Sequence, residues 1–357
     1  MAEPETQHGG GGAGRRQNVK CVVWDLDNTL WEGVLLEDDA VRLRPRAAEV
    51  VRTLSERGIL HSVASRNDAR QATEKLQEFG LDEYFLYPQI NWNSKVSSVE
   101  AIAAALNIGL DAVAFVDDDP FERGEMSFSH PDVLCIDAAD LPRLASMPEL
   151  TPAFVTADAR RRHLMYRGEM ARKEAEAAFT GPQEEFLAGL GMVFEIGAAR
   201  EDDLERAEEL TMRTHQLNST GVTYSFEELD RFRRSDRHQL LVAGLEDRYG
   251  SYGKIGLALV ECDPAVWTIK LLLMSCRVMS RGVGTLMLGH IMRQASEAGA
   301  RLRAEFLPNE RNRVMYVTYK FGGFKEAGRR GDLLLLESDL SHIRPAPAYV
   351  QVLPGKS

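Results

Sequence analysis

The spacing of apolar and polar residues differs between the two halves of the chain, and it changes near Glu185. Up to about Met147, short apolar runs of strand length alternate with segments whose apolar residues recur at helical spacing. The predicted strands are 19–27, 59–65, 84–90, 112–116 and 133–136, and the predicted helices are 46–57, 68–79 and 95–106. Strands separated by helices of this length predict a doubly wound parallel sheet, an α/β fold.

The second half follows a different order. Strands are predicted at 192–196, 239–245, 254–262, 267–275, 302–307 and 332–337, with helices at 201–214, 282–298 and 311–321. A meander of strands followed by a helix that starts at Gly282 predicts a mixed α/β domain. The charged helix predicted at 158–179 ends at Gly181-Pro182 and reads as a connector. We therefore expect a disordered tail (1–18), a first domain (19–150), a helical connector (151–185), a second domain (186–345) and a tail (346–357).

The composition of the chain disfavours some classes of function. The 357 residues carry a formal net charge of −11, which argues against nucleic-acid binding because such binding needs a basic surface. The sequence contains no apolar run that approaches the roughly 18 residues of a membrane span. The four cysteines show no C-x-x-C pair. We expect a cytoplasmic protein with free thiols and no membrane partner. An anionic ligand would need a local basic pocket, and arginines concentrate at 160–172 and at Arg277 and Arg281.

The first predicted strand ends in two carboxylates, Asp25 and Asp27. Side chains two residues apart on a strand share a direction, so both acids can face one volume beyond the carboxyl end of the strand. One carboxylate can attack a phosphorus atom while the other handles the proton of the leaving group, with Mg²⁺ between them. A solvated Asp-rich turn is the alternative.

Later strand ends carry residues that a phosphate site would need. Ser65, followed by Arg66 and Asn67, can donate to phosphoryl oxygens, although Ser65 could instead cap the next helix. Lys95 opens a helix and can neutralise charge on a transferred phosphate, although it could be a surface residue. Adjacent carboxylates at Asp117-Asp118-Asp119 suit Mg²⁺, although they could form a turn. Their order, each after a successive strand, favours the phosphate site.

In the second half, Cys276 follows a strand and precedes the helix that starts at Gly282, with Arg277 and Arg281 nearby. A helix N-terminus and cations favour the thiolate, which is the nucleophilic form. The alternative is a packed strand cysteine, which is our interpretation of the other three cysteines.

The Asp25-Leu26-Asp27-Asn28-Thr29 stretch with Ser65, Lys95 and Asp117-Asp118 resembles the four motifs of the haloacid dehalogenase (HAD) phosphatases. The resemblance implies Asp25 as the nucleophile and Asp27 as the general acid/base. It implies Ser65 and Lys95 as phosphate binders, and we count Thr29, Arg66 and Asn67 as further candidates for binding substrate. Mg²⁺ would be held by Asp25, Asp27 through its backbone, and Asp117, with Asp118 as an alternative ligand.

The amino-acid sequence around these motifs is similar to that of the narrower FkbH-like branch of the family. This similarity extends from about Val19 to Glu337. Arg213–Asn218, Ser275–Val278, Ala304–Phe306 and Asn312 carry it in the second half. The order of elements there also resembles the Gcn5-related N-acetyltransferase (GNAT) fold. Met279 replaces the Gln or Arg usual in the GNAT pyrophosphate loop, which argues against ordinary acetyl-CoA, whereas a phosphopantetheine arm presented by a carrier protein is compatible with the pattern.

The FkbH-like resemblance implies a bifunctional glyceryl transferase/phosphatase that takes 1,3-bisphosphoglycerate and loads D-glyceryl onto an acyl carrier protein for polyketide-type biosynthesis. Cys276 would carry the acyl group, and Asp25 would remove the C3 phosphate. His215 is a candidate base, and Asn218, Arg277 and Asn312 are candidates for holding the glyceryl group. The alternatives are a Mg²⁺-dependent phosphatase with a substrate-selecting second domain, a lactyl-type transferase and a noncatalytic docking module.

Overall fold

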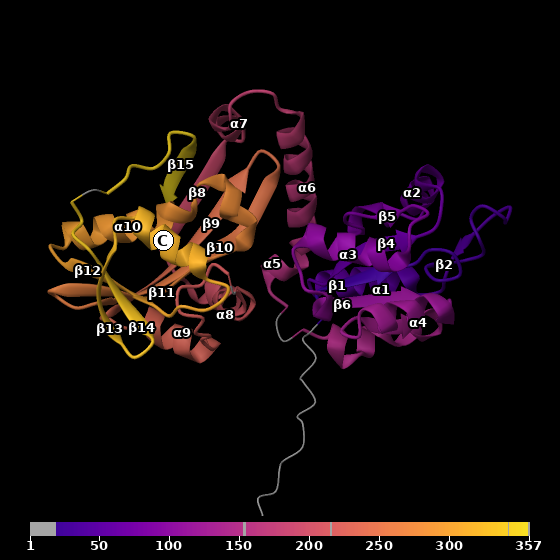
Figure 1. The fold of residues 1–357 in the computed structure, drawn as a ribbon, viewed down its shortest axis with the longest axis horizontal. Coiled ribbons are helices and arrows are strands. Elements are labelled where there is room, and N and C mark those ends of the chain that lie inside the picture. The colour runs from indigo at the N-terminus through magenta and orange to yellow at the C-terminus, as the bar shows by residue number, and fades with distance from the viewer. Residues whose placement is uncertain (1–18, 153–154, 215, 342, 356–357) are drawn as a thin grey trace, which may run out of the picture. The chain divides into compact units, whose positions relative to one another are not determined.

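A computed structural model of the chain describes residues 19–152, 155–214, 216–341 and 343–355, without the side chains of Cys276 and Ser280. The chain divides into two compact units, Met1–Val155 and Thr156–Ser357. Each unit has its own sheet and its own apolar core, and the predicted α/β fold class is confirmed in both (Figure 1). Among the described residues, none of the helices has the length and apolar character needed to cross a membrane.

The first unit contains a five-stranded parallel sheet with the order β5-β4-β1-β6-β7. Its strands are β1 (Cys21–Trp24), β4 (Leu60–Ser65), β5 (Gln89–Ile90), β6 (Val113–Asp117) and β7 (Leu134–Asp137). The chain moves outward from β1 through β4 to β5, then returns to the other side of β1 for β6 and β7. This reversal beside β1 is a topological switch point, where open α/β sheets bind ligands at the carboxyl ends of their strands.

Four helices connect these strands: α1 (Ala47–Glu56), α2 (Ala69–Glu78), α3 (Lys95–Leu106) and α4 (Pro120–Ser129). β1, β4 and β6 are buried along their whole length, as expected for parallel strands covered on both faces. Side chains of Asp68, Ser94 and Asp119 cap α2, α3 and α4, which fixes where each helix begins just past a strand end. The small ribbon of β2 (Trp31–Glu32) and β3 (Arg42–Leu43) after β1 was not predicted.

The second unit contains an eight-stranded mixed sheet with the order β13-β14-β12-β11-β10-β9-β8-β15. Its strands are β8 (Met192–Ala198), β9 (His238–Asp247), β10 (Gly250–Cys262), β11 (Val266–Met274), β12 (Arg301–Phe306), β13 (Lys325–Arg330), β14 (Leu333–Ser338) and β15 (Val350–Pro354). Strands β8 to β11 form the predicted antiparallel meander, whereas β11 and β12 pair in parallel. This parallel pairing ends at Ile269 and Ala304, before the end of either strand.

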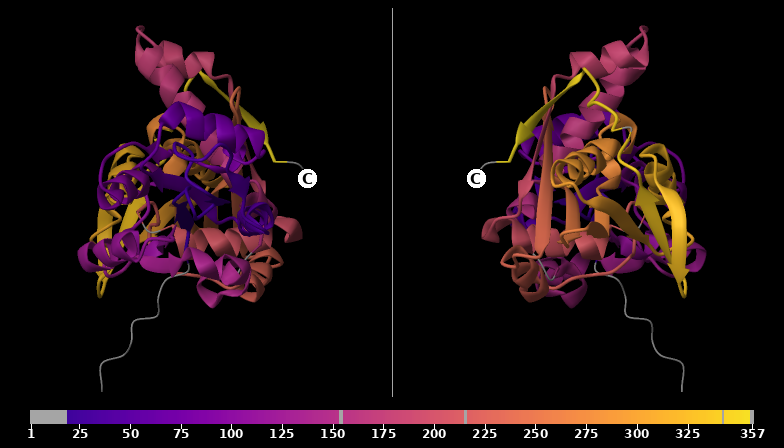
Figure 2. Two further views of the ribbon diagram at one scale, coloured as in Figure 1. Left: turned by 90° about the vertical axis from the view of Figure 1, so that its right-hand side faces the viewer. Right: turned by 90° about the vertical axis from the view of Figure 1, so that its left-hand side faces the viewer.

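Alternating residues of this sheet bury its two faces in two cores. Leu257 and Leu273 pack in a core with α8 (Leu204–Arg213) and α9 (Phe226–Arg233). Ala258 and Leu272, one position along, pack in the core that includes α10 (Gly284–Glu297), and Figures 1 and 2 show that helix against the sheet. Successive strand residues point to opposite faces, so this two-sided sequence pattern requires helices on both faces.

From Thr156 onward, the segment expected to connect the domains (151–185) falls in the second unit. It forms α5 (Ala157–Arg160), α6 (Arg162–Ala178) and α7 (Gln183–Gly189). On α6, Arg172 makes two hydrogen bonds of 2.7 and 2.9 Å to the buried Asp247 carboxylate, and this pair ties the helix to the end of β9. The segment 346–357, expected as a tail, contains β15, which pairs in parallel with β8.

Candidate active sites

Asp25, Lys95 and Asp117 meet at the carboxyl end of the parallel sheet. The Lys95 ammonium, on the first residue of α3, lies 3.2 Å from Asp25 Oδ1 and 2.6 Å from Asp117 Oδ2. All three residues are buried. Lys95 is therefore not a surface residue, and one cation lies between two carboxylates that would otherwise repel each other.

Burial disfavours the charged form of Asp25. Burial, together with the neighbouring Asp117 carboxylate and against the opposing effect of Lys95, raises the pKa of Asp25 to about 7. Burial also raises the pKa of Asp117. A carboxylate must be ionised to act as a nucleophile. At neutral pH, a further cation beside Asp25 would stabilise its ionised form.

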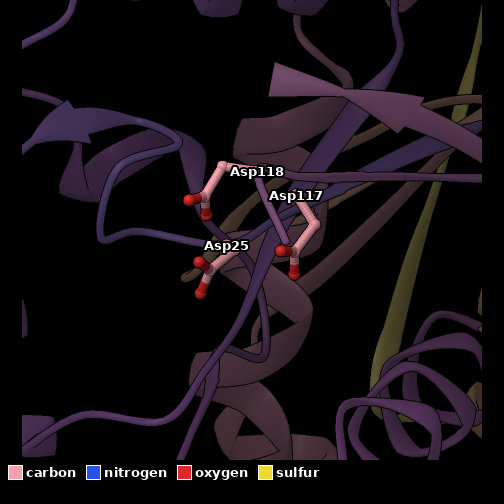
Figure 3. Close-up of side chains that lie close together, drawn as sticks. All are labelled: Asp25, Asp117 and Asp118. Carbon is pink, nitrogen blue, oxygen red and sulfur yellow. The ribbon is translucent and has the colours of Figure 1, made fainter. Parts of the chain in front are cut away.

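The acidic cluster fits a hard divalent cation. Asp25, Asp117 and Asp118 each offer a carboxylate oxygen, and these oxygens lie within 4.8 Å of one another (Figure 3). Mg²⁺ prefers such oxygen ligands and keeps part of its water shell. Thr29 is fully buried and exchanges two hydrogen bonds with Asp118, whose backbone N–H lies 3.0 Å from the Thr29 hydroxyl. Thr29, predicted to bind substrate, thus orients a candidate metal ligand.

Asp27 is held apart from this cluster. Its Oδ1 accepts hydrogen bonds from Trp31 Nε1 at 2.7 Å and from the Leu35 backbone N–H at 3.0 Å. Its Oδ2 accepts one from Asn67 Nδ2 at 2.9 Å. The Asp27 carboxylate is not part of the metal-binding group, so only its backbone remains available for the metal role that the motif implies. Asn67, predicted to bind substrate, positions the candidate acid/base instead.

Ser65 lies where the phosphate site needs it. It is the last residue of β4, is almost fully buried, and its hydroxyl lowers the pKa of Asp25 against the larger effect of burial. Asp68 rather than Ser65 caps α2, which removes the capping alternative. Arg66 is 40% exposed at its side chain and pairs with the buried Glu122 at 2.5 Å, so a phosphate would have to draw it from that partner.

Trp31 and Glu122 were missed by the sequence analysis. Trp31 stands four residues after Asp27, and its indole has a specific hydrogen-bond partner there, although a buried aromatic after a strand usually indicates only packing. Glu122 lies in the first turn of α4, and burial raises its pKa. A single charged residue in a helix gives no signal in the sequence that it is buried.

Cys276 begins a short 3-10 helix, η6 (Cys276–Arg281), directly after β11 and Ser275. The side chain of Cys276 and the whole of His215 lie outside the described residues, so their predicted roles stay predictions. The Gly-started helix does not follow Cys276 directly, because η6 and Gly282 separate it from α10. The half-buried Arg277 contacts Ser275 Oγ and Met165 Sδ.

Beyond Ile269 and Ala304, β11 and β12 no longer pair with each other. Asn218 and Asn312 form hydrogen bonds in the loop that lies there. Both residues are 0% exposed. Asn218 Oδ1 accepts hydrogen bonds from the backbone N–H groups of Thr220 and Gly221, and Asn312 Nδ2 donates to the carbonyls of Asn218 and Leu307. Their amides serve the backbone, so their placement does not support the predicted contact with a glyceryl group.

Several known proteins resemble parts of this chain. Residues 32–122 match the family of haloacid dehalogenase-like hydrolases. Human "Magnesium-dependent phosphatase 1" is 29% identical over 136 residues, which cover 33% of this chain and 76% of that protein. The N-terminal part of a Bacteroides fragilis protein, solved with Mg and containing a phosphatase domain, is 29% identical with a TM-score of 0.32.

The match to the Bacteroides fragilis structure covers 35% of this chain and 38% of that chain. Another solved structure, the ribosomal-protein-S18-alanine N-acetyltransferase of Escherichia coli, is 18% identical with a TM-score of 0.34, covering 42% of this chain and 95% of that chain. The first unit is thus similar in sequence to HAD-like hydrolases, including a magnesium-dependent phosphatase.

Proposed function

We propose that the first unit is a Mg²⁺-dependent phosphatase that acts on a phosphate monoester. The observation that carries this proposal is the juxtaposition of Asp25, Lys95 and Asp117, buried together at the topological switch point. Asp25 would attack phosphorus while the bond from phosphorus to the ester oxygen breaks, and Asp27 would protonate the departing oxygen. Water would then hydrolyse the aspartyl phosphate. Asp25, Asp117 and Asp118 would hold Mg²⁺, which supplies charge neutralisation when bound.

We further propose that the second unit transfers an acyl group through Cys276 to the phosphopantetheine thiol of an acyl carrier protein. The proposed donor is 1,3-bisphosphoglycerate, whose C1 acyl phosphate is activated and whose C3 phosphate is a monoester suited to Asp25. The Cys276 thiolate would form a bond to the C1 carbonyl carbon, and the bond to phosphate would break with release of inorganic phosphate. The carrier thiol would then attack the same carbonyl carbon, the D-glyceryl group would pass to the carrier as a new thioester, and the Cys276 thiolate would leave.

Intact-mass spectrometry of a purified carrier protein tests this proposal. Incubation with enzyme, Mg²⁺ and 1,3-bisphosphoglycerate should add a glyceryl group to the carrier. With Asp25→Asn, any acyl group transferred should retain its phosphate. A carrier that gains no mass while the enzyme still hydrolyses monoesters would favour a phosphatase with a substrate-selecting second unit. Full phosphatase activity of Asp25→Asn would contradict the phosphatase proposal.

A further inference from the structure

The helix α11 (Arg313–Phe321) of the second unit has an apolar stripe on its exposed side. Val314, Val317 and Phe321 follow one another at helical spacing and therefore share one side of the helix. Their exposed fractions range from 39% for Val317 to 60% for Phe321. The opposite side, which includes the buried Tyr319, packs in the same core as α10. The helix thus has two apolar sides, and the described parts of the unit bury one of them.

Basic side chains border this stripe. Arg313 and Lys320 are exposed and stand seven residues apart, so they lie on the same side of α11. Arg293 of α10 and Arg344 line a pocket that the ring of Phe321 also lines, and the described residues around that pocket include no carboxylate. Within the described parts of the chain, none of these four cations has a carboxylate within 4.0 Å.

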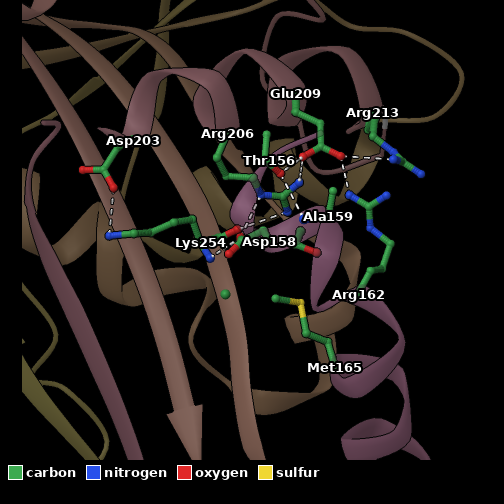
Figure 4. A network of polar contacts seen from close by, with 12 residues as sticks. Thr156, Asp158, Ala159, Arg162, Met165, Asp203, Arg206, Glu209, Arg213 and Lys254 are labelled. Atoms are coloured by element: carbon green, nitrogen blue, oxygen red, sulfur yellow. Dashed lines mark hydrogen bonds and ion pairs between the residues drawn. The ribbon is translucent and has the colours of Figure 1, made fainter. Parts of the chain in front are cut away.

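Arginines elsewhere in the second unit have acidic partners. Glu209 of α8, for example, lies 2.6 Å from Arg206 and 3.0 Å from Arg213 (Figure 4). The cations beside α11 instead leave a local positive potential in a chain whose formal net charge is −11. An exposed apolar stripe bordered by charges of one sign is typical of a surface that binds another protein.

This surface lies beside the segment that contains Cys276. Asn312, directly before α11, donates to the carbonyl of Asn218 at 3.1 Å, and Asn218 forms an antiparallel bridge with Leu273 of β11. Cys276 follows Leu273 by three residues. In addition, Thr285 of the pocket lies in the first turn of α10, shortly after η6 ends. A protein bound to α11 would therefore lie next to the elements that flank Cys276.

We infer that the exposed side of α11, together with Arg293 and Arg344, docks an acidic protein, and that in the proposed transfer this protein is the acyl carrier protein. The inference rests on the proposed function, because it names the surface for a partner that this function requires. A second copy of the chain suits the surface less well, since a two-fold contact would place the basic side chains against one another. An acidic partner with apolar side chains at its centre would complement both the stripe and the cations.

The affinity of the full chain for a purified carrier protein that lacks its phosphopantetheine arm tests the inference apart from any chemistry at Cys276. We expect Arg313→Glu combined with Lys320→Glu to raise the Kd about tenfold or more, and added salt to weaken wild-type binding. Val317→Asp should also weaken binding, because it places a charge in the apolar stripe. Arg231→Glu is the matched control, since Arg231 is exposed on α9, which packs on the other face of the sheet.

Unchanged affinity in all the α11 variants, or no binding of the carrier by the wild type, would overturn the inference. Self-association of the wild type that Val317→Asp abolishes would also overturn it and assign the surface to a second copy. Thermal unfolding should match the wild type in every variant, because the replaced side chains are exposed. Failure of the proposed transfer would look different: the α11 variants would still lose affinity, yet neither Cys276 nor an intact carrier would gain an acyl group.

Discussion

Asp25 and Asp27 stand two residues apart, yet their surroundings differ. Asp25 is buried beside Lys95 and Asp117, whereas Asp27 is held by donors from Trp31, Leu35 and Asn67. Two carboxylates in different environments are suited to different tasks, and here the buried one faces the candidate metal. This division supports Asp25 as the nucleophile and Asp27 as the acid/base.

Replacing Asp25 by Asn should reduce monoester hydrolysis by about three orders of magnitude or more, because Asn offers no anionic oxygen to attack phosphorus. The variant should remain folded, since Asn replaces a buried carboxyl group that lies next to another carboxylate. Steady-state hydrolysis of a chromogenic phosphate monoester and thermal unfolding measure both effects. Substantial residual turnover would show that Asp25 is not the nucleophile.

Trp31→Phe should lower kcat about tenfold with little change in KM. The substitution keeps an aromatic ring in the core but removes the 2.7 Å hydrogen bond that holds Asp27 Oδ1. Kinetics of the same monoester, with circular dichroism to confirm folding, provide the measurement. An unchanged kcat would mean that the remaining donors, Leu35 and Asn67, position Asp27 without the indole.

The sequence predicted the charged residues of this site better than it predicted their hydrogen-bond partners. Asp25, Lys95 and Asp117 follow from their places at strand ends, since parallel strands bring those ends together. Thr29 and Asn67 were predicted to bind substrate. Their actual partners, Asp118 and Asp27, depend on side-chain directions that strand spacing does not determine.

Among the elements, η6 begins at Cys276 and ends before Gly282. Gly282 ends this 3-10 helix with φ of +69°, and a Cβ at that position would lie too close to the Tyr349 hydroxyl. Gly282→Ala should therefore destabilise the protein by roughly 1–3 kcal/mol. Gly284→Ala is the matched control, because a Cβ on this first residue of α10 meets nothing within 4 Å. Urea unfolding that gave both variants equal stability would contradict this account of the turn.

The predicted elements match the structure where apolar periodicity is strong and fail where packing decides. Helices α1, α2 and α3 begin and end within a few residues of their predicted bounds. The strand β13 was missed because its residues are all exposed, so it has no apolar pattern to detect. The charged sequence of α6 is typical of a solvated connector. The side chain of Arg172 is nevertheless buried and pairs with Asp247. Sequence patterns do not reveal which charged residues are paired in the interior.

For the molecule as a whole, the acidic site links stability to pH and to metal. The pKa of Asp25 is raised to about 7 in the folded state, above the ordinary value of about 3.9. The folded protein therefore binds a proton that the unfolded chain releases between these values, so without metal its stability should fall as pH rises through that window. Thermal unfolding in a chelator across this window should show the decline, and Asp25→Asn should reduce it.

Added Mg²⁺ should reverse this trend, because it binds the ionised carboxylates. The rise in melting temperature on adding Mg²⁺ should be larger at a pH of about 8 than at a pH of about 5. Asp117→Asn should diminish the rise, since Asp117 is one of the three grouped carboxylates. An equal rise at both pH values would contradict a metal site built on Asp25.

The proposed function joins phosphate removal at Asp25 to acyl transfer at Cys276 in one chain. Peptide mass mapping tests this combination, with the wild-type enzyme quenched after incubation with Mg²⁺ and 1,3-bisphosphoglycerate in the absence of carrier protein. We expect a glyceryl or phosphoglyceryl adduct on the peptide that contains Cys276, and loss of that adduct when carrier protein is added before the quench. Acylation of the carrier without any adduct on Cys276, or undiminished acylation by Cys276→Ala, would contradict it.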